Sequence, residues 1–157
     1  MSQTIRQETF LNSFFAILDE TFEHHRGIYL DENTSLIQTL ETVTAEEASI
    51  PVGNQCASLA AQVAHVTFYL EVLERYIFLN SDANVDWDEI WRTVEKVSPE
   101  EWQNLKRGLK RKYSQISREL RKLEAWDEEE KIGGALAILV HTAYHLGEIR
   151  QALCTLK

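Results

Sequence analysis

Residues 131–156 read KIGGALAILVHTAYHLGEIRQALCTL and carry few charges for a segment of this length. Apolar residues fall on nearly every side when the segment is drawn as an α-helix. A helix that is apolar on most of its circumference is normally enclosed by other parts of the protein. We therefore expect a helix from about Lys131 to Leu156, and we expect it to be the most buried helix of the protein.

Three further segments have the apolar spacing of amphipathic helices, with steps of three and four residues. They are residues 5–22, 58–79 and 98–123. The third segment begins with a serine cap at Ser98, a proline in the first turn at Pro99, and Glu101, which can complete a capping box. The acidic run at residues 127–130 suits the positive N-terminal end of the last helix.

The connections between these helices differ in character. Gly27 marks a break after the first helix. Residues 44–54 read TAEEASIPVGN, in which Thr44 and Glu47 can form a one-turn capping box. Residues 80–97 show no sustained period apart from a short amphipathic turn. A segment of that length can cross the roughly 30 Å of a helix of about 20 residues, so the third long helix can run parallel to the second.

The composition indicates one all-α domain over residues 1–157. Apolar residues make up 44% and charged residues 26%, as in an ordinary globular chain. Six Gly and two Pro are too few turn residues for a many-stranded sandwich or barrel. The net charge of -9 disfavours nucleic acid as a partner.

Targeting signals and cysteine usage point to a cytoplasmic protein. No apolar stretch is long enough to span a membrane, and the start MSQTIRQETF lacks the apolar core of a signal peptide. We expect no membrane partner. Cys56 and Cys154 are too few for a disulfide framework, and we interpret both as small hydrophobic residues.

Three histidines are the candidates for chemistry. His141 and His145 are four residues apart and therefore share one face of the last helix. His65 lies within the apolar helix at 58–79. If the two helices are neighbours, three neutral imidazoles meet and leave a fourth position for water or substrate, as in a catalytic metal site. Alternatively, each histidine is a core residue with its own hydrogen-bond partner, and the pattern leaves both interpretations open.

Two other kinds of helical metal site do not fit the spacing. Di-iron carboxylate bundles use Glu-x-x-His motifs, and no histidine here has a glutamate three positions before it. The His-Glu-x-x-His motif of zincins is also absent, because Thr142 follows His141. A mononuclear site with three histidines remains.

Several motifs occur together along the chain. They are EEAS-x-x-P-x-G before the second long helix, AAQVAHVTFYLEVL around His65, Asp86-Trp87 and Trp91, SPEEW at the start of the third helix, and HTAYHLGEIRQ near the end. Over nearly the whole chain they resemble the DinB-like, or DinB/YfiT-like, superfamily of metalloenzymes. The resemblance implies an all-α four-helix bundle of up-down-down-up topology, with a long crossover between helices two and three. It also implies one divalent metal ion held by His65, His141 and His145, and imidazole ligands suit Zn²⁺ or Ni²⁺.

The resemblance also bears on activity. The superfamily includes transferases that use low-molecular-weight thiols such as bacillithiol, a mycothiol-dependent maleylpyruvate isomerase, and many members labelled metal-dependent hydrolases. The resemblance does not choose between these activities. Because a metal ion held by three neutral imidazoles is a Lewis acid that deprotonates a bound thiol, our leading hypothesis is an enzyme that transfers a thiol cosubstrate to a small-molecule electrophile. Two alternatives stay open, namely hydrolysis of a small substrate and a non-catalytic bundle that binds metal or a partner. The resemblance and the apolar helices favour a homodimer.

Glu148 stands where many relatives have Gln or another neutral residue, and it shares the helix face of His141 and His145. It is a candidate catalytic base that accepts a proton from a metal-bound nucleophile. It could instead orient one histidine as a hydrogen-bond acceptor, or pair with a cation such as Arg150. These three roles stay open.

Five other side chains are weaker candidates. Tyr69 and Tyr144 could donate hydrogen bonds to a bound substrate, although aromatic residues at such spacings are usually core residues. His24 and His25 precede the break at Gly27, where a loop could bring either one to the metal or leave both solvated. Cys56 has no basic neighbour that would lower its thiol pKa and make it a nucleophile.

Overall fold

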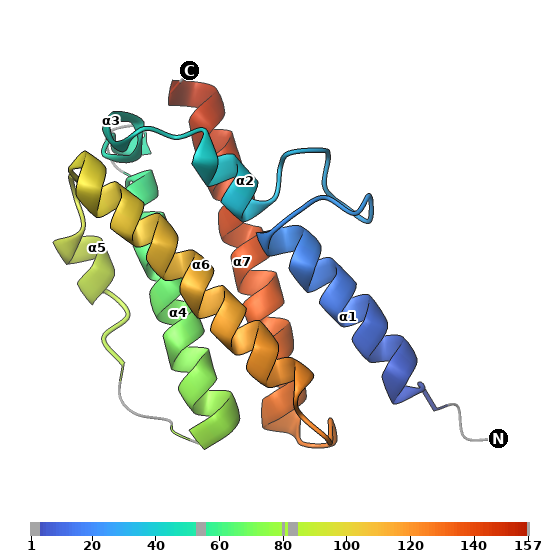
Figure 1. The fold of residues 1–157 in the computed structure, drawn as a ribbon. Helices are drawn as coiled ribbons and strands as arrows, with labels where there is room; N and C mark the ends of the chain where they lie inside the picture. The colour runs from blue at the N-terminus through green and yellow to red at the C-terminus, as the bar shows by residue number, and fades with distance from the viewer. Residues whose placement is uncertain (1–3, 53–55, 80, 82–84, 157) are drawn as a thin grey trace.

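The structure, a computed structural model, describes residues 4–52, 56–79, 81 and 85–156. Within these ranges it consists of seven helices and contains no strand, so the prediction of an all-α protein is confirmed (Figure 1). The four long helices are α1 (Gln7–Phe22), α4 (Leu59–Leu79), α6 (Pro99–Arg121) and α7 (Glu129–Leu156). The three short ones are α2 (Leu36–Glu41), α3 (Ala45–Ala48) and α5 (Glu89–Thr93).

Local capping signals explain where two of the helices, α3 and α6, begin. The Ser98 hydroxyl accepts a hydrogen bond from the backbone N–H of Glu101, and the Glu101 carboxylate accepts one from the N–H of Ser98. Thr44 and Glu47 form the same reciprocal pair at α3. Both predicted capping boxes are therefore confirmed. Gly53, at the end of the predicted connector, and residues 80 and 82–84 of the predicted crossover lie outside the described residues.

α4 occupies the centre of the structure and packs against both α6 and α7. Of its 21 residues 11 are buried, against 9 of the 28 residues of α7. The prediction that the last helix is the most buried one is therefore wrong. Three apolar residues of α7 spaced four apart, Leu136, Val140 and Tyr144, are exposed. An apolar composition does not reveal which side of a helix lacks a neighbour.

α1 contacts α6 through aromatic stacking, a hydrogen bond and an ion pair. The rings of Phe22 and Tyr113 stack with centroids 4.1 Å apart. The Tyr113 hydroxyl donates to Asp19 at 2.9 Å, and Arg121 pairs with the same carboxylate at 2.7 Å. These contacts close one side of the core.

A buried carboxylate shapes the chain after α1. Glu20 is fully buried and accepts hydrogen bonds from the backbone N–H groups of Arg26, Ile28 and Tyr29 at 2.9–3.0 Å. Gly27 lies within this turn with a φ of 74°, a conformation that favours glycine. The predicted break at Gly27 is confirmed.

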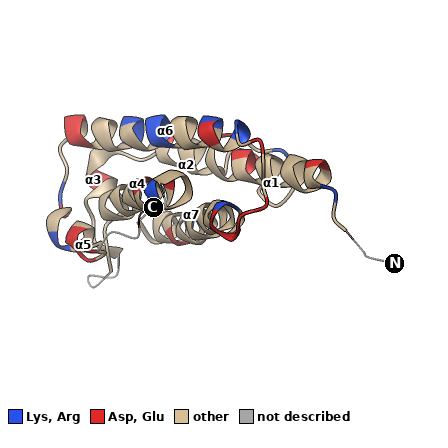
Figure 2. Ribbon diagram, turned by 90° about the horizontal axis from the view of Figure 1, so that it is seen from below, with Lys and Arg blue, Asp and Glu red and all other residues tan. Residues whose placement is uncertain are grey.

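Most charged residues of α6 lie on the side turned away from α4 and α7, which leaves its apolar stripe facing the core (Figure 2). Lys112 is an exception, because it pairs with Glu74 of α4. Among the helices of the described ranges, none combines the length and the apolar character that crossing a membrane requires.

α4 and α7 run side by side in opposite directions and approach each other closely at Gly134 (Figure 1). A Cβ atom placed on Gly134 would lie 2.5 Å from Cγ1 of Ile77 and 2.9 Å from its Cδ1. Real Cβ atoms essentially never come that close to another carbon. The missing side chain therefore permits this contact between the two helices.

We expect Gly134→Ala to lower the free energy of unfolding by about 1–3 kcal/mol, because the added methyl group overpacks the contact with Ile77. Gly133→Ala is the matched control, since a Cβ there meets no described heavy atom within 4 Å. We expect the control to raise the free energy of unfolding by up to about 1 kcal/mol, because alanine favours helix over glycine. Urea denaturation measures both, and equal effects would contradict the role given to Gly134.

Candidate metal centre

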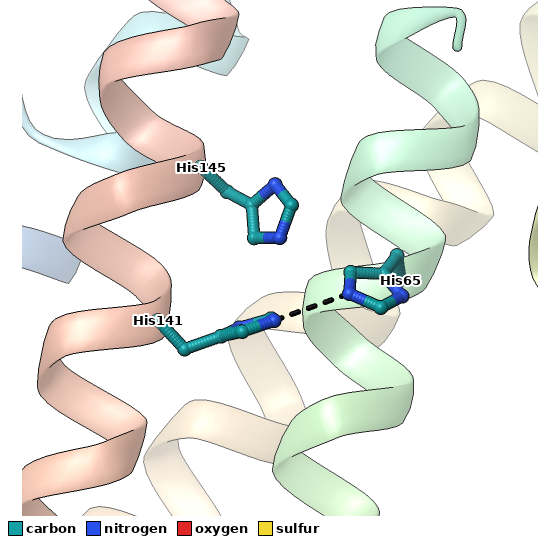
Figure 3. Close-up of side chains that lie close together, drawn as sticks. All are labelled: His65, His141 and His145. Atoms are coloured by element: carbon teal, nitrogen blue, oxygen red, sulfur yellow. Dashed lines mark hydrogen bonds between the residues drawn. The ribbon is translucent and has the colours of Figure 1, made fainter. Parts of the chain in front are cut away.

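Three histidine side chains meet between α4 and α7 (Figure 3). His65 belongs to the first half of α4, and His141 and His145 lie on consecutive turns of α7. Figure 3 shows a nitrogen of each ring turned toward the space between the helices. One ring nitrogen from each histidine lies within 4.8 Å of the other two. The structure thus brings all three sequence-predicted histidines together.

Helix geometry and helix packing each contribute to this meeting. Residues four apart on a helix project in nearly the same direction, and the ring centroids of His141 and His145 are 4.5 Å apart. His65 reaches the pair from α4, with centroid distances of 5.0 and 4.9 Å. His65 and His145 are buried and His141 is half-buried, so the cluster has little contact with water.

The nitrogen spacing fits a single metal ion. Two nitrogens bound to one tetrahedral Zn²⁺ at 2.0–2.1 Å are about 3.3 Å apart. Nε2 of His65 and Nε2 of His141 are 3.1 Å apart, and no separation in the set exceeds 4.8 Å. The nitrogen of His145 lies within 4.8 Å of both, so all three ring nitrogens surround one small space.

The three rings are only partly hydrogen-bonded. Among the described residues, the Nδ1 atoms of His65, His141 and His145, on the ring edges away from the shared centre, have no hydrogen-bond partner. A buried polar atom without a partner costs about 1–3 kcal/mol. Two Nε2 atoms at 3.1 Å satisfy each other only if one ring carries the proton between them. Three imidazoles in this position fit a divalent ion of the kind that nitrogen ligands prefer.

Burial keeps the three rings neutral. Burial, together with the nearby His145, lowers the pKa of His65 to about 4 and that of His141 to about 3. Burial also lowers the pKa of His145, although the Glu148 carboxylate opposes this effect. Neutral imidazole is the form that binds metal. At neutral pH the lone pairs are therefore available without loss of a proton.

Aromatic side chains surround the three rings. Tyr69 stacks on His141 with ring centroids 3.5 Å apart and an angle of 7° between the planes. Trp91 from α5 lies 4.4 Å from His65, and Tyr144 lies 5.1 Å from His145. Tyr144 is 62% exposed and so is not the core residue that its spacing suggested. These rings make an environment of low polarity around the nitrogens.

Glu148 lies beside His145 rather than between the three histidines. Its Oε2 atom is 2.9 Å from Nδ1 of His145, but the angles are not those of a hydrogen bond. The ring nitrogen that faces the other histidines is Nε2, on the opposite edge (Figure 3). Among the ion pairs of the described residues, none joins Glu148 to Arg150.

Trp91 is the site residue whose position the sequence did not reveal. In the sequence, Trp91 was noted only as part of a motif within a short amphipathic turn. It is far from the three histidines along the chain, so the sequence does not reveal its contact with His65. α5 packs against α4 and so places the Trp91 ring on His65. The local pattern showed that α5 forms a turn of helix, but not which side chain it covers.

The remaining candidates do not join the cluster. His24 and His25 are exposed in the segment after α1 and are not among the ring nitrogens that meet. Cys56 and Cys154, interpreted from the sequence as small hydrophobic residues outside any disulfide framework, are both free and exposed.

The pKa shifts predict how metal-free protein responds to acid. In the unfolded chain the histidines have a pKa of about 6.5, but in the folded protein those of His65 and His141 are about 4 and 3. The unfolded chain therefore binds protons first, and the free energy of unfolding should fall as pH decreases from about 6.5 toward 4. Urea denaturation in excess chelator between pH 7.5 and 5 measures this decline.

The control for this experiment is the double variant His65→Gln, His141→Gln. Carboxylates titrate mainly below this window, so the variant should show a flatter dependence on pH. A decline of equal slope in both proteins would show that other groups are responsible.

Comparisons with known proteins identified no relative of this chain. No family model, no curated protein and no solved structure matches the chain. The resemblance to the DinB-like superfamily therefore stays a prediction that rests on the sequence motifs.

Proposed function

We propose that the protein is a divalent-metal-dependent enzyme that transfers a low-molecular-weight thiol to a small electrophile. The observation that carries this proposal is the meeting of three neutral imidazoles whose ring nitrogens lie within 4.8 Å of one another. His65, His141 and His145 would hold one Zn²⁺ or Ni²⁺ ion. When bound, such an ion supplies a Lewis acid that favours the deprotonated form of a thiol.

The three ligands leave room for chemistry. Three uncharged protein ligands preserve the full positive charge of an ion and leave a coordination position open. The aromatic rings of Tyr69 and Trp91 keep the polarity around that position low, which strengthens electrostatic interactions there. In the proposed reaction a carbon–sulfur bond forms, the leaving group departs with its electron pair, and the thiol proton passes to solvent.

We assign Glu148 the role of positioning His145. Its carboxylate lies 2.9 Å from Nδ1 of that ring, and a slight rotation would let it accept a hydrogen bond from Nδ1–H. That bond would fix the tautomer in which the Nε2 lone pair faces the other histidines, as carboxylates commonly do beside metal-binding histidines. The alternative role, a base that accepts the thiol proton, is an outcome of the experiment below.

The fold topology of the DinB-like superfamily is part of the same proposal. It would make α1, α4, α6 and α7 an up-down-down-up four-helix bundle, with the connection between α4 and α6 as its crossover. The directions of these four helices in Figure 1 and the position of α5 within that connection support this topology. The homodimer and the cytoplasmic location stay predictions.

Zinc-loaded protein should accelerate the reaction of cysteine with 1-chloro-2,4-dinitrobenzene, and chelator should abolish the acceleration. Release of the thioether product is followed by absorbance, and metal content is measured by elemental analysis. We expect about one equivalent of metal in the wild-type protein and its loss in His65→Ala, His141→Ala and His145→Ala. His25→Ala is the matched control, because His25 is exposed and outside the cluster.

The outcomes separate the candidate functions. Metal that stays bound in all three alanine variants would refute the ligand set. Rates that do not depend on any thiol offered, together with turnover of ester or amide substrates, would favour the hydrolase. Bound metal without turnover of either kind would favour the non-catalytic bundle.

Replacing Glu148 distinguishes positioning from base catalysis. If Glu148 positions His145, Glu148→Gln should weaken zinc binding by about tenfold or more, and saturating zinc should restore the turnover number and its pH profile. Competition with a chromophoric chelator measures the affinity. Glu124→Gln, at an exposed position, is the control. Unchanged zinc affinity with a turnover number that stays low at saturating zinc would instead identify Glu148 as the base.

A further inference from the structure

A groove lies along the interface of α4 and α7, and one of its lining residues, Tyr69, stacks on His141. On α4 it is lined by Tyr69, Val72 and Tyr76, which follow His65 by 4, 7 and 11 residues. On α7 it is lined by Ala137, Gly134 and Gly133, which precede His141 by 4, 7 and 8 residues. These spacings repeat the helical period, so each set continues the face that carries the histidine. We call this space the α4–α7 groove.

The two faces extend in the same direction because the helices are antiparallel (Figure 1). Moving forward along α4 from His65 and backward along α7 from His141 leads toward the same end of the molecule. The eleven residues from His65 to Tyr76 correspond to about 16 Å of helix. The groove has a volume of about 650 Å³, which is within the range of small-molecule sites.

Small residues on α7 keep this groove open. Gly133 lines it, and a Cβ there would meet no described heavy atom within 4 Å. Gly134 has the different role of letting Ile77 approach. Opposite them stand the large rings of Tyr69 and Tyr76. The α4 side of the groove is therefore lined by aromatic rings, and Gly133 on the α7 side leaves space between the two helices.

Tyr69 joins the groove to the candidate metal centre. One ring forms both a wall of the groove and the surface stacked on His141. Trp87, which also lines the groove, lies 5.6 Å from Tyr69. The three histidines do not themselves line the groove, and Tyr69 is the side chain that the groove and the histidine cluster share.

The lining selects for an uncharged occupant. Among the described residues that line the groove, none carries a charge, and the polar side chains are Ser81 and the hydroxyls of Tyr69 and Tyr76. A charged group placed there would lose water without gaining a partner of opposite charge. Contact with aromatic rings and small aliphatic side chains favours an alkyl or aryl group.

We propose that the α4–α7 groove binds the uncharged alkyl or aryl tail of a substrate whose polar head lies at the three histidines. The inference rests on the proposed function and specifies its substrate class. The electrophile is then an amphiphilic molecule with an extended apolar tail rather than a compact polar metabolite.

Linear hydroxamic acids test the proposal, because their common head group binds zinc while the tail length varies. Isothermal titration of zinc-loaded protein with acetohydroxamate, butanohydroxamate, hexanohydroxamate and octanohydroxamate measures each dissociation constant. We expect affinity to rise about three- to fourfold for each methylene group added within the groove. A hydroxamate of the same length with a terminal ammonium group should lose this gain.

Gly133→Leu should fill the groove without disturbing the helix contact at Gly134. We expect it to remove the dependence on chain length while acetohydroxamate binds as to the wild type. Gly147→Leu is the matched control, because a Cβ at Gly147 also meets no described heavy atom within 4 Å and Gly147 is not part of the groove. Thermal unfolding of both variants checks that they are folded.

The outcomes separate this proposal from the proposed function. Acetohydroxamate binding with no dependence on chain length, or a dependence that Gly133→Leu leaves intact, overturns the groove proposal alone. Failure to bind zinc, or to bind acetohydroxamate when loaded, overturns the proposed function. In that case the groove proposal is tested with metal-free protein and octanohydroxamate. Binding that is weakened by Gly133→Leu and preserved in Gly147→Leu supports the groove proposal, and any other result overturns it.

Discussion

The close packing of α4 against α7 is the constraint on which the candidate site and the groove depend. Helices that pack with large side chains between them stand about 10 Å apart, whereas small residues let them approach further. Gly134 provides such a place, because Ile77 occupies the space of its missing side chain. With the helices held together there, His65 can reach the two histidines of α7.

The three histidines weaken the core that surrounds them. Buried rings whose three Nδ1 atoms lack hydrogen-bond partners among the described residues cost free energy that leucine or phenylalanine at the same positions would not. Places where a protein departs from good local packing are often functional. The same burial keeps the rings neutral, so the property that costs stability also prepares the nitrogens for a metal ion. The stacked ring of Tyr69 and the indole of Trp91 complete this environment.

Much of the helical structure could be predicted because its causes are local. The capping boxes at Thr44 and Ser98 involve residues three apart, and the apolar period of α4 spans neighbouring turns. Predictions failed where the outcome depended on distant neighbours. α7 is apolar around its circumference, yet Val140 and Tyr144 face no other helix.

For the candidate site, the amino-acid sequence was sufficient to place His141 and His145 on one face, since a spacing of four follows from the helical period alone. It also identified His65 as a polar residue in an apolar helix. The pairing of α4 with α7 decided that His65 meets the other two, across 76 residues of chain. The tertiary structure likewise decided that Trp91 covers the cluster, that Glu148 lies at the outer edge of His145, and that small residues of α7 leave a groove beside Tyr69. Contacts of this kind depend on how helix surfaces fit together in space, and no local pattern along the chain encodes that fit.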